Sequence, residues 1–250
     1  MNRHLILISL VALCTVSAAA LWASGALAVP TESNTASTCV ETTAGTGEFA
    51  DAHCGSKGGT KGWKHVAIPV GEGTQLTAPA TSTWEFIAQL SGPEIIVTAP
   101  EVECLECMVE NHEEEVKGKK WMDLQGTGRL RFSKVTTNLQ NKGCVVANNG
   151  VVTTPSLKFT TTTAGNLLIE PVSGVTLVLV EWKPGCAISD LPFTGHINGT
   201  LTGATLKIET VKGEVALGGA FSFEAFVKAG STLSGGLTEG KSHPISLTAS

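Results

Sequence analysis

The residues best suited to chemistry lie between positions 101 and 115, where two cysteines, a histidine and several glutamates occur close together. Cys104 and Cys107 form a C-x-x-C motif, and His112 follows five residues later. Two thiolates and an imidazole are ligands that zinc prefers, but a closed zinc site needs a fourth. A thioredoxin-like redox pair is a second interpretation, although the strand-to-helix setting that activates such a thiol is not indicated. A structural disulfide is the third and favoured interpretation.

A disulfide between these two cysteines places a condition on the local backbone. Residues three apart in an extended strand lie about 10 Å apart and on opposite faces. The Cα atoms of a disulfide lie within about 7 Å of each other. Cys104 and Cys107 can therefore bridge only if Leu105 and Glu106 make a turn, and otherwise each cysteine needs another partner.

The acidic run Glu113–Glu115 raises the question of calcium, because carboxylate oxygens are hard ligands. No ordered ligand spacing such as that of an EF-hand loop is present, so a solvated run of charge is favoured. The sequence leaves open whether the charged segment 101–120 is helical or binds a metal. We expect a charged, solvated excursion between strands over 104–120, because its apolar residues do not form a helical stripe. No cofactor is expected.

The elements that must position these residues follow an N-terminal export signal over residues 1–28. Arg3 and His4 form a polar, positive start, an apolar run follows over 5–13, and Ala26–Ala28 provides a small-x-small cleavage site. The run is too short for a good membrane span, so no transmembrane span is expected in the mature chain. A lipoprotein signal with Cys14 as the lipidated residue is an alternative that Leu13 fits poorly. We predict a secreted or extracytoplasmic protein.

Export changes how the cysteines are interpreted. The chain has seven, and loss of Cys14 with the signal peptide leaves six, which are Cys39, Cys54, Cys104, Cys107, Cys144 and Cys186. An even number in an oxidising compartment favours disulfides over thiol chemistry. The sequence alone does not choose among the possible pairings.

The charge of the mature chain limits its partners. The full chain has 17 basic and 22 acidic side chains, and Arg3 leaves with the signal, so the mature net charge is −6. No basic stripe is present, which argues against nucleic acid and against an anionic membrane surface. The partner is unknown from sequence, and a cell-envelope polymer or another protein is the candidate.

The mature chain has the pattern of an all-β protein. Residues 29–38 are polar and aperiodic and are expected to form a flexible lead, and 39–62 is a glycine-rich loop. Short alternating segments follow, with turn residues between them, over 64–70, 83–90, 94–99, 128–139, 157–163, 166–172, 175–182, 200–210, 215–217, 220–227 and 244–249. The segment 175–182 is apolar on both faces, which predicts a central strand. We predict one domain over 39–250, a single antiparallel β-sandwich or flattened barrel with short glycine-rich turns and disulfides.

Several stretches resemble a group of secreted β-rich proteins of actinobacteria whose function is unknown. The stretches are Phe49–Cys54 after Cys39, His65–Ile68, Gly150–Thr154 after Cys144, Glu170–Gly174 before Gly185–Cys186, and Gly199–Thr205. The resemblance implies export, an all-β fold and the disulfides Cys39–Cys54 and Cys144–Cys186. The C-x-x-C motif and the acidic run depart from the pattern.

No catalytic motif is found, so the sequence favours an exported, non-enzymatic structural or binding protein, with an association with the cell envelope as one form. A secreted hydrolase acting on polysaccharide or peptide is the alternative, because catalytic triads assemble across space. Four tryptophans follow residue 28, namely Trp63, Trp84, Trp121 and Trp182. We expect them to cap the core, although an exposed one could stack on a sugar ring. A possible binding face is the row of hydroxyls at Thr160 and Thr162, which alternate with Leu157, Phe159 and Thr161.

Overall fold

A computed structural model describes residues 34–43, 45–52, 54, 56–57, 62–77, 83–116, 118–161, 166–202, 205–218, 223–232, 234–238 and 241–249. They belong to one unit, Thr31–Ser250. Strands dominate this unit, and every pairing between named strands is antiparallel, which confirms the predicted all-β class. The predicted signal peptide lies outside the described residues.

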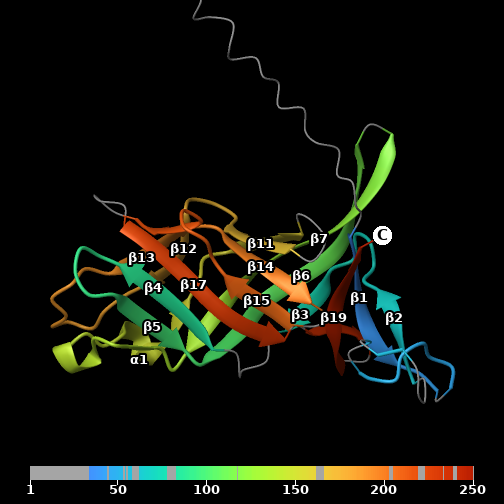
Figure 1. Cartoon of the computed structure of the whole chain (residues 1–250), viewed down its shortest axis with the longest axis horizontal. Helices are drawn as coiled ribbons and strands as arrows, with labels where there is room; N and C mark the ends of the chain where they lie inside the picture. Colours follow the sequence, from blue (N-terminus) through green and yellow to red (C-terminus); the bar gives the residue numbers. More distant parts are fainter. Residues whose placement is uncertain are drawn as a thin grey trace, which may run out of the picture. The chain divides into compact units, whose positions relative to one another are not determined.

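The strands are short in most of the unit, with one long pair near its middle (Figure 1). The first seven are β1 (Asn34–Glu41), β2 (Trp63–Ala67), β3 (Thr74–Thr77), β4 (Trp84–Gln89), β5 (Ile95–Ala99), β6 (Glu101–Val116) and β7 (Lys119–Ser133). The next six are β8 (Thr136–Thr137), β9 (Val152–Thr153), β10 (Leu157–Thr161), β11 (Asn166–Pro171), β12 (Thr176–Val180) and β13 (Leu191–Gly195). The last six are β14 (Ile197–Thr202), β15 (Thr205–Glu209), β16 (Val215–Leu217), β17 (Phe223–Thr232), β18 (Ser234–Thr238) and β19 (Lys241–Ala249).

One antiparallel ladder connects most of these strands. It runs from β5 through β4, β17, β15, β14, β11, β10, β7, β6, β3, β18, β19 and β1 to β2. Three branches leave this ladder. In the first, β17 pairs with β16, β16 with β13, and β13 with β12. In the other two, β8 pairs with β5, and β9 pairs with β7. The sheet folds over itself in the manner of a sandwich but does not close.

An aromatic cluster fills the space between the facing parts of this sheet. Phe86 and Trp84 of β4 contact Phe132 of β7, with ring centroids 5.1 and 5.4 Å apart, and Phe86 also lies 5.4 Å from Phe193 of β13. All four rings are buried. Side chains alternate between the two faces along each strand. In β10, Leu157, Phe159 and Thr161 point inward to this core, and the residues between them lie on the outer face.

The first strand begins earlier than the sequence indicates. Residues 34–38, which were expected in a flexible lead, belong to β1, and Ala36, Ser37 and Thr38 are buried between β2 and β19. Polar, aperiodic residues form this strand because both of its edges find partners far away in the sequence. The other residues of the predicted lead, 29–33, lie outside the described part of the chain.

The charged segment 104–120 is also a correction. It is neither an irregular excursion nor a helix, because β6 runs without interruption to Val116 and pairs with β7 as a long hairpin. The tip of this hairpin projects from the rest of the sheet (Figure 1). Cross-strand pairs of opposite charge, including Glu103 with Arg131 at 3.7 Å and Glu113 with Lys120 at 2.6 Å, let the charged residues adopt strand structure.

The strand at 175–182 is less two-sided than predicted. Strand β12 has a register shift between Thr176 and Val178, and this bulge turns both Leu177 and Val178 inward. Val175 and Leu179 remain 67% and 40% exposed. The apolar residues on the second face of the strand are therefore partly at the surface.

The two short helical segments are η1 (Gln140–Lys142) and α1 (Ala147–Gly150). Asn148, Asn149 and Gly150 of α1 all have positive φ, so this single turn has left-handed geometry. Asn and Gly are the residues that adopt this conformation at least cost. The turn places Val146 against Trp182 and thereby connects the loop to the end of β12.

Candidate functional site

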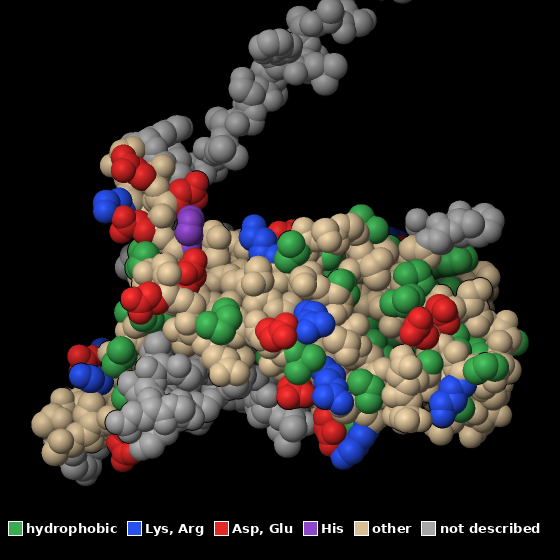
Figure 2. Space-filling view, turned by 180° about the vertical axis from the view of Figure 1, so that it is seen from behind, with side chains coloured by type: hydrophobic (Ala, Val, Ile, Leu, Met, Phe, Trp, Pro, Cys, Tyr) green, Lys and Arg blue, Asp and Glu red, His purple; other side chains and the backbone are tan. Residues whose placement is uncertain are grey.

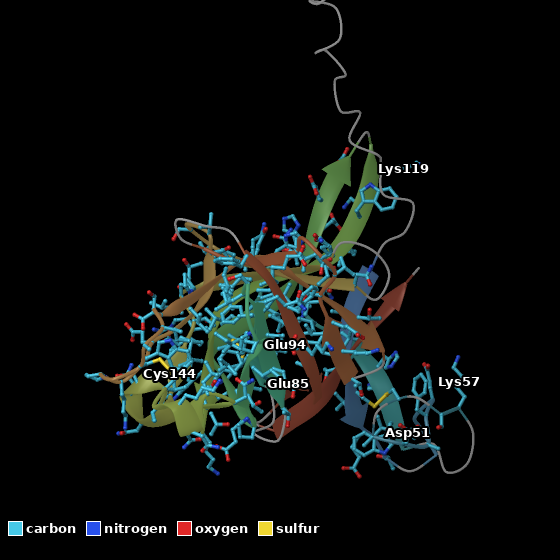
Figure 3. The ribbon with its side chains drawn as sticks, turned by 60° about the vertical axis from the view of Figure 1, so that its left-hand side comes forward. Asp51, Lys57, Glu85, Glu94, Lys119 and Cys144 are labelled. Carbon is cyan, nitrogen blue, oxygen red and sulfur yellow. A yellow bond between two sulfur atoms is a disulfide. The ribbon has the colours of Figure 1, made fainter. Side chains whose placement is uncertain are left out.

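Three disulfides include every cysteine that follows residue 28. Cys39–Cys54 closes the loop after β1, Cys144–Cys186 joins the segment after η1 to the turn after β12, and Cys104–Cys107 lies within β6. The pairs Cys39–Cys54 and Cys144–Cys186 are those that the family resemblance implies. Figure 3 shows the disulfide at Cys144, in the same part of the unit as η1 and α1.

The Cys104–Cys107 disulfide forms because the strand bulges between its two cysteines. Leu105 pairs with Arg129 but Met108 pairs with Thr127, so two residues of β6 stand opposite one residue of β7. Glu106 takes a φ of 53°, which provides the turn that an extended strand lacks, and the two Cα atoms come to 5.6 Å. The favoured interpretation of this motif as a structural disulfide agrees with this geometry.

Two glycines of β7 make room for the bulge. A Cβ atom at Gly128 would lie 2.6 Å from Cα of Cys107, and one at Gly126 would lie 2.9 Å from Cα of Val109. Side chains larger than hydrogen do not fit at these distances. The disulfide, the bulge and the two glycines therefore form one structural unit at the base of the projecting hairpin.

Neither metal interpretation of the 101–115 region finds support in the geometry. Within the described residues, no group of three or more His, Cys, Asp or Glu side chains is arranged to hold a metal ion. The two cysteines are oxidised, and the glutamates of β6 alternate between its two faces rather than converge.

A bulge changes which side chains of β6 point outward. Before it, Val102 points inward, whereas beyond it the inward residues are Cys107, Val109 and Asn111. Glu110, His112 and Glu114 consequently lie on the outer face of the hairpin, opposite Gln125, Asp123 and Trp121 of β7. This arrangement brings chemically capable residues together that are not neighbours in the sequence.

Three of these side chains are joined by hydrogen bonds. His112 Nδ1 lies 3.2 Å from Asp123 Oδ1, and Gln125 Nε2 donates to Asp123 Oδ2 at 3.1 Å. Gln125 Nε2 also lies 3.1 Å from His112 Nδ1. Exposure of the His112 and Asp123 side chains is 40% and 25%, so the group is accessible from solvent. When Nδ1 of His112 carries the proton and donates to Asp123, its Nε2 is left free to bind another molecule.

Hydrolysis would need a nucleophile at this group. Over the described residues, the partners of the His112 ring are Asp123 and Gln125, one or the other according to whether Nδ1 carries a proton or a lone pair, and no hydroxyl or thiol takes part. The arrangement can orient an imidazole and accept hydrogen bonds, and none of the described residues bonded to it supplies the nucleophile that a triad needs.

The predicted binding face at Thr160 lies beside this group. Thr160 of β10 pairs with Gln125 of β7 on the outer face, as the alternation predicts. Its hydroxyl is shielded from solvent and has no hydrogen-bond partner among the residues described, so it does not present the expected row of hydroxyls. The second residue of that prediction, Thr162, lies outside the described part of the chain.

The outer face around Thr160 is mostly polar, and it is hollowed where Asn166, Thr200 and Lys207 line a pocket. The residues of this face include two cross-strand pairs, Thr127 with Lys158 and Asn166 with Thr200. Lys158 Nζ also lies 4.0 Å from a carboxylate oxygen of Glu170. Uncharged polar side chains and backbone cover most of the surface seen in Figure 2, and charged groups are scattered over it. A histidine in that view lies among acidic side chains where the hairpin leaves the sheet.

The tryptophans take different positions. Trp84 is in the main core, Trp63 packs against a small second core of Cys39, Phe49 and Cys54, and Trp182 donates from Nε1 to the Ser189 carbonyl at 3.0 Å. Trp121 is half-buried on the hairpin and belongs to neither core. Core packing thus accounts for the others but not for Trp121.

The sequence points to His112 but does not reveal its partners Asp123 and Gln125. The sequence feature that could have indicated these partners is the alternation of polar and apolar residues in Asp123-Leu124-Gln125. This alternation becomes informative only when the register of β6 with β7 is known. No helix in the described ranges is long and apolar enough to cross a membrane.

The fold and this polar group define an all-β, disulfide-linked protein with a projecting hairpin. Comparison of the chain with protein-family models, curated proteins and solved structures finds no match.

Proposed function

We propose that the mature chain is an exported, non-enzymatic binding protein associated with the cell envelope, and that its ligand contacts the outer face of the sheet around β7 and β10. The observation that carries this proposal is the group His112, Asp123 and Gln125, which is accessible from solvent and has no nucleophile bonded to it among the described residues. Such a group can recognise a ligand by hydrogen bonds without transforming it.

Export is supported by two independent features. Residues 1–28 have the pattern of a signal peptide, and the six cysteines beyond them form disulfides, which persist in oxidising compartments. The resemblance to secreted β-rich proteins of actinobacteria agrees with this proposal.

Secretion and envelope retention test the proposal directly. The full chain is expressed in a secreting bacterial host, and the exported product is identified by its N-terminal sequence, expected to begin at Val29. A variant in which Ala28→Arg blocks the small-x-small site should accumulate unprocessed. Unprocessed protein that stays in the cytoplasm with free thiols would contradict the proposed export.

Binding is tested with the purified, oxidised protein and isolated cell walls. We expect co-sedimentation that Thr160→Lys weakens, because a lysine beside Gln125 places a long charged side chain on the contact face. Gln89→Lys, an exposed position of β4, is the matched control and should bind like the wild type. Equal binding by both variants would remove this face from the proposal.

The hydrolase alternative is favoured only by the 3.2 Å approach of His112 to Asp123. Soluble fragments released from the walls by the wild type, and not by His112→Ala, would establish it in place of simple binding.

A further inference from the structure

Six side chains form a row of three cross-strand pairs on the outer face of the hairpin, which we call the hairpin ladder. The pairs are Glu110 with Gln125, His112 with Asp123, and Glu114 with Trp121. Side chains of successive pairs on one face of a strand are separated by about 6.8 Å, because each residue advances the chain by about 3.4 Å. The ladder thus spans about 14 Å, comparable to a chain of two to three sugar rings.

The ladder combines a planar aromatic side chain with planar polar groups. Trp121 is half-buried and presents part of an indole at the outermost pair, while the bonded group of His112, Asp123 and Gln125 follows at the next two pairs. Indole faces pack against apolar ring surfaces, and carboxylate, amide and imidazole groups exchange hydrogen bonds with hydroxyls. Pyranose rings offer both kinds of surface.

The carboxylates of the ladder are available to accept hydrogen bonds. Glu110 and Glu114 form no ion pair with any described residue, whereas Glu113 on the opposite face pairs with Lys120 at 2.6 Å. Three carboxylates and one imidazole make the ladder net negative, which disfavours an anionic polymer by like-charge repulsion. A ligand that is rich in hydroxyls and has no anionic groups therefore fits this surface, and a neutral one needs no charged partner for the imidazole and the amide.

A protein partner fits this surface less well. Stable protein interfaces are centred on buried apolar or aromatic anchors, and Trp121 is the single large apolar side chain of the ladder. The remaining ladder side chains are polar or charged, and such groups lose their hydration at a cost when a protein covers them.

We propose that the hairpin ladder binds a neutral polysaccharide, with one sugar ring stacked on Trp121 and the hydroxyls of the adjoining rings bonded to Asp123, His112 and Gln125. This inference rests on the proposed binding function and names its ligand class. The disulfide-linked bulge at Cys104–Cys107 supports the site, because it holds the ladder side chains on the outer face.

Native affinity electrophoresis of the purified, oxidised chain tests the proposal. The gels contain hydroxyethylcellulose, glycol chitin or dextran as neutral probes, and polygalacturonate as an anionic probe. We expect retardation by at least one neutral polymer and none by polygalacturonate. Asp123→Asn, which keeps the side-chain shape, should raise the dissociation constant about tenfold or more, because a hydrogen bond to a charged acceptor is lost.

Trp121→Ala should abolish the retardation, and Trp121→Phe should retain part of it because an aromatic face remains. The double variant Glu113→Gln with Lys120→Gln changes the opposite face of the same hairpin and should bind like the wild type. Circular dichroism and disulfide mapping establish that each variant is folded. Retardation that is unaffected by both Asp123→Asn and Trp121→Ala would overturn the proposal.

The same preparations separate failure of this inference from failure of the proposed function. Wall binding without retardation by any neutral polymer would overturn the polysaccharide ligand and leave the binding function intact. Loss of both would overturn both, and retardation by polygalacturonate alone would overturn the charge argument and with it the neutral ligand.

Discussion

The carboxamide of Asn111 pairs with the backbone of Ala36 as a neighbouring strand would. Its Oδ1 accepts from the Ala36 N–H at 2.9 Å, and its Nδ2 donates to the Ala36 carbonyl at 2.9 Å and to the Ile68 carbonyl at 2.8 Å. Asn111 is fully buried in β6, so one side chain of the long hairpin fixes both β1 and the segment that follows β2.

Asn111→Leu should therefore destabilise the protein strongly. The substitution keeps the branched outline of the side chain but takes away the Asn111 partner of the buried Ala36 N–H and Ile68 carbonyl, at a cost of about 3 kcal/mol, while the Ala36 carbonyl keeps the Ile68 N–H at 3.0 Å. Urea unfolding of the oxidised protein measures this cost. Asn138→Ala is the control, because Asn138 also bonds two backbone groups, of Glu94 and Ile96, but is exposed, so water can replace it. An equal loss in both variants would mean that burial of Asn111 is not the cause.

Gly128→Ala should disturb the base of the hairpin. The added Cβ would lie 2.6 Å from Cα of Cys107 and 2.8 Å from its Cβ, so the two strands must separate, at a cost of about 2 kcal/mol. Thermal unfolding measures the effect. Gly92→Ala is the matched control, because a Cβ there meets nothing within 4 Å and should leave the midpoint nearly unchanged. A Gly128→Ala protein as stable as the wild type would refute the close approach.

The three disulfides should contribute unequally to stability. In the chain-entropy model, the sequence separations of 42, 15 and 3 residues correspond to about 4, 3 and 2 kcal/mol for Cys144–Cys186, Cys39–Cys54 and Cys104–Cys107. Paired Cys→Ser variants, compared by urea unfolding, should show this order. A larger loss from the Cys104–Cys107 pair than from Cys144–Cys186 would show that the bulge stabilises the native sheet beyond its effect on the unfolded chain.

The environment of His65 should make stability depend on pH. Burial lowers the pKa of His65 below 6.5, an effect that Lys57 reinforces and Glu48 opposes. Its Nε2 is shielded and has no partner within the described residues, and its ring stacks on Phe49 at 4.7 Å. The folded state therefore holds the proton less tightly than the unfolded state, and the stabilisation present above pH 6.5 is lost as the pH falls through the lowered pKa.

We expect the urea midpoint of the wild type to fall between pH 7.5 and pH 5 by more than that of His65→Gln, which cannot titrate at this position. The comparison cancels the contribution of the other titrating groups. Parallel curves for the two proteins would contradict a role for His65.

Local patterns in the sequence predict several elements well. The hairpins expected over 83–90 with 94–99 and over 157–163 with 166–172 correspond to β4 with β5 and β10 with β11. Each consists of two short, mostly apolar segments on either side of a turn sequence, so the information needed to form it is local. The all-β class follows from the same kind of reasoning, whereas the pairs Cys39–Cys54 and Cys144–Cys186 were expected only from the resemblance and Cys104–Cys107 only on condition of a turn.

Strand β1 could not be predicted in the same way. Its residues Thr35, Ser37 and Thr38 are polar, and nothing near them in the sequence marks a strand. Burial of Ser37 and Thr38 results from pairing with β2 on one edge and with β19, near the opposite end of the chain, on the other. Long-range pairing overrides local propensity in such a segment.

By itself, the sequence predicted an all-β protein linked by disulfides and pointed to His112 within a chemically rich segment. The tertiary structure alone decided what surrounds that histidine. Strand side chains alternate with a period of two, so the single extra residue of the bulge at Glu106 exchanges the two faces of β6 from that point onward. It sends Asn111 into the core and places His112 beside Asp123, and no pattern of composition or spacing within β6 reveals that exchange before the register with β7 is known.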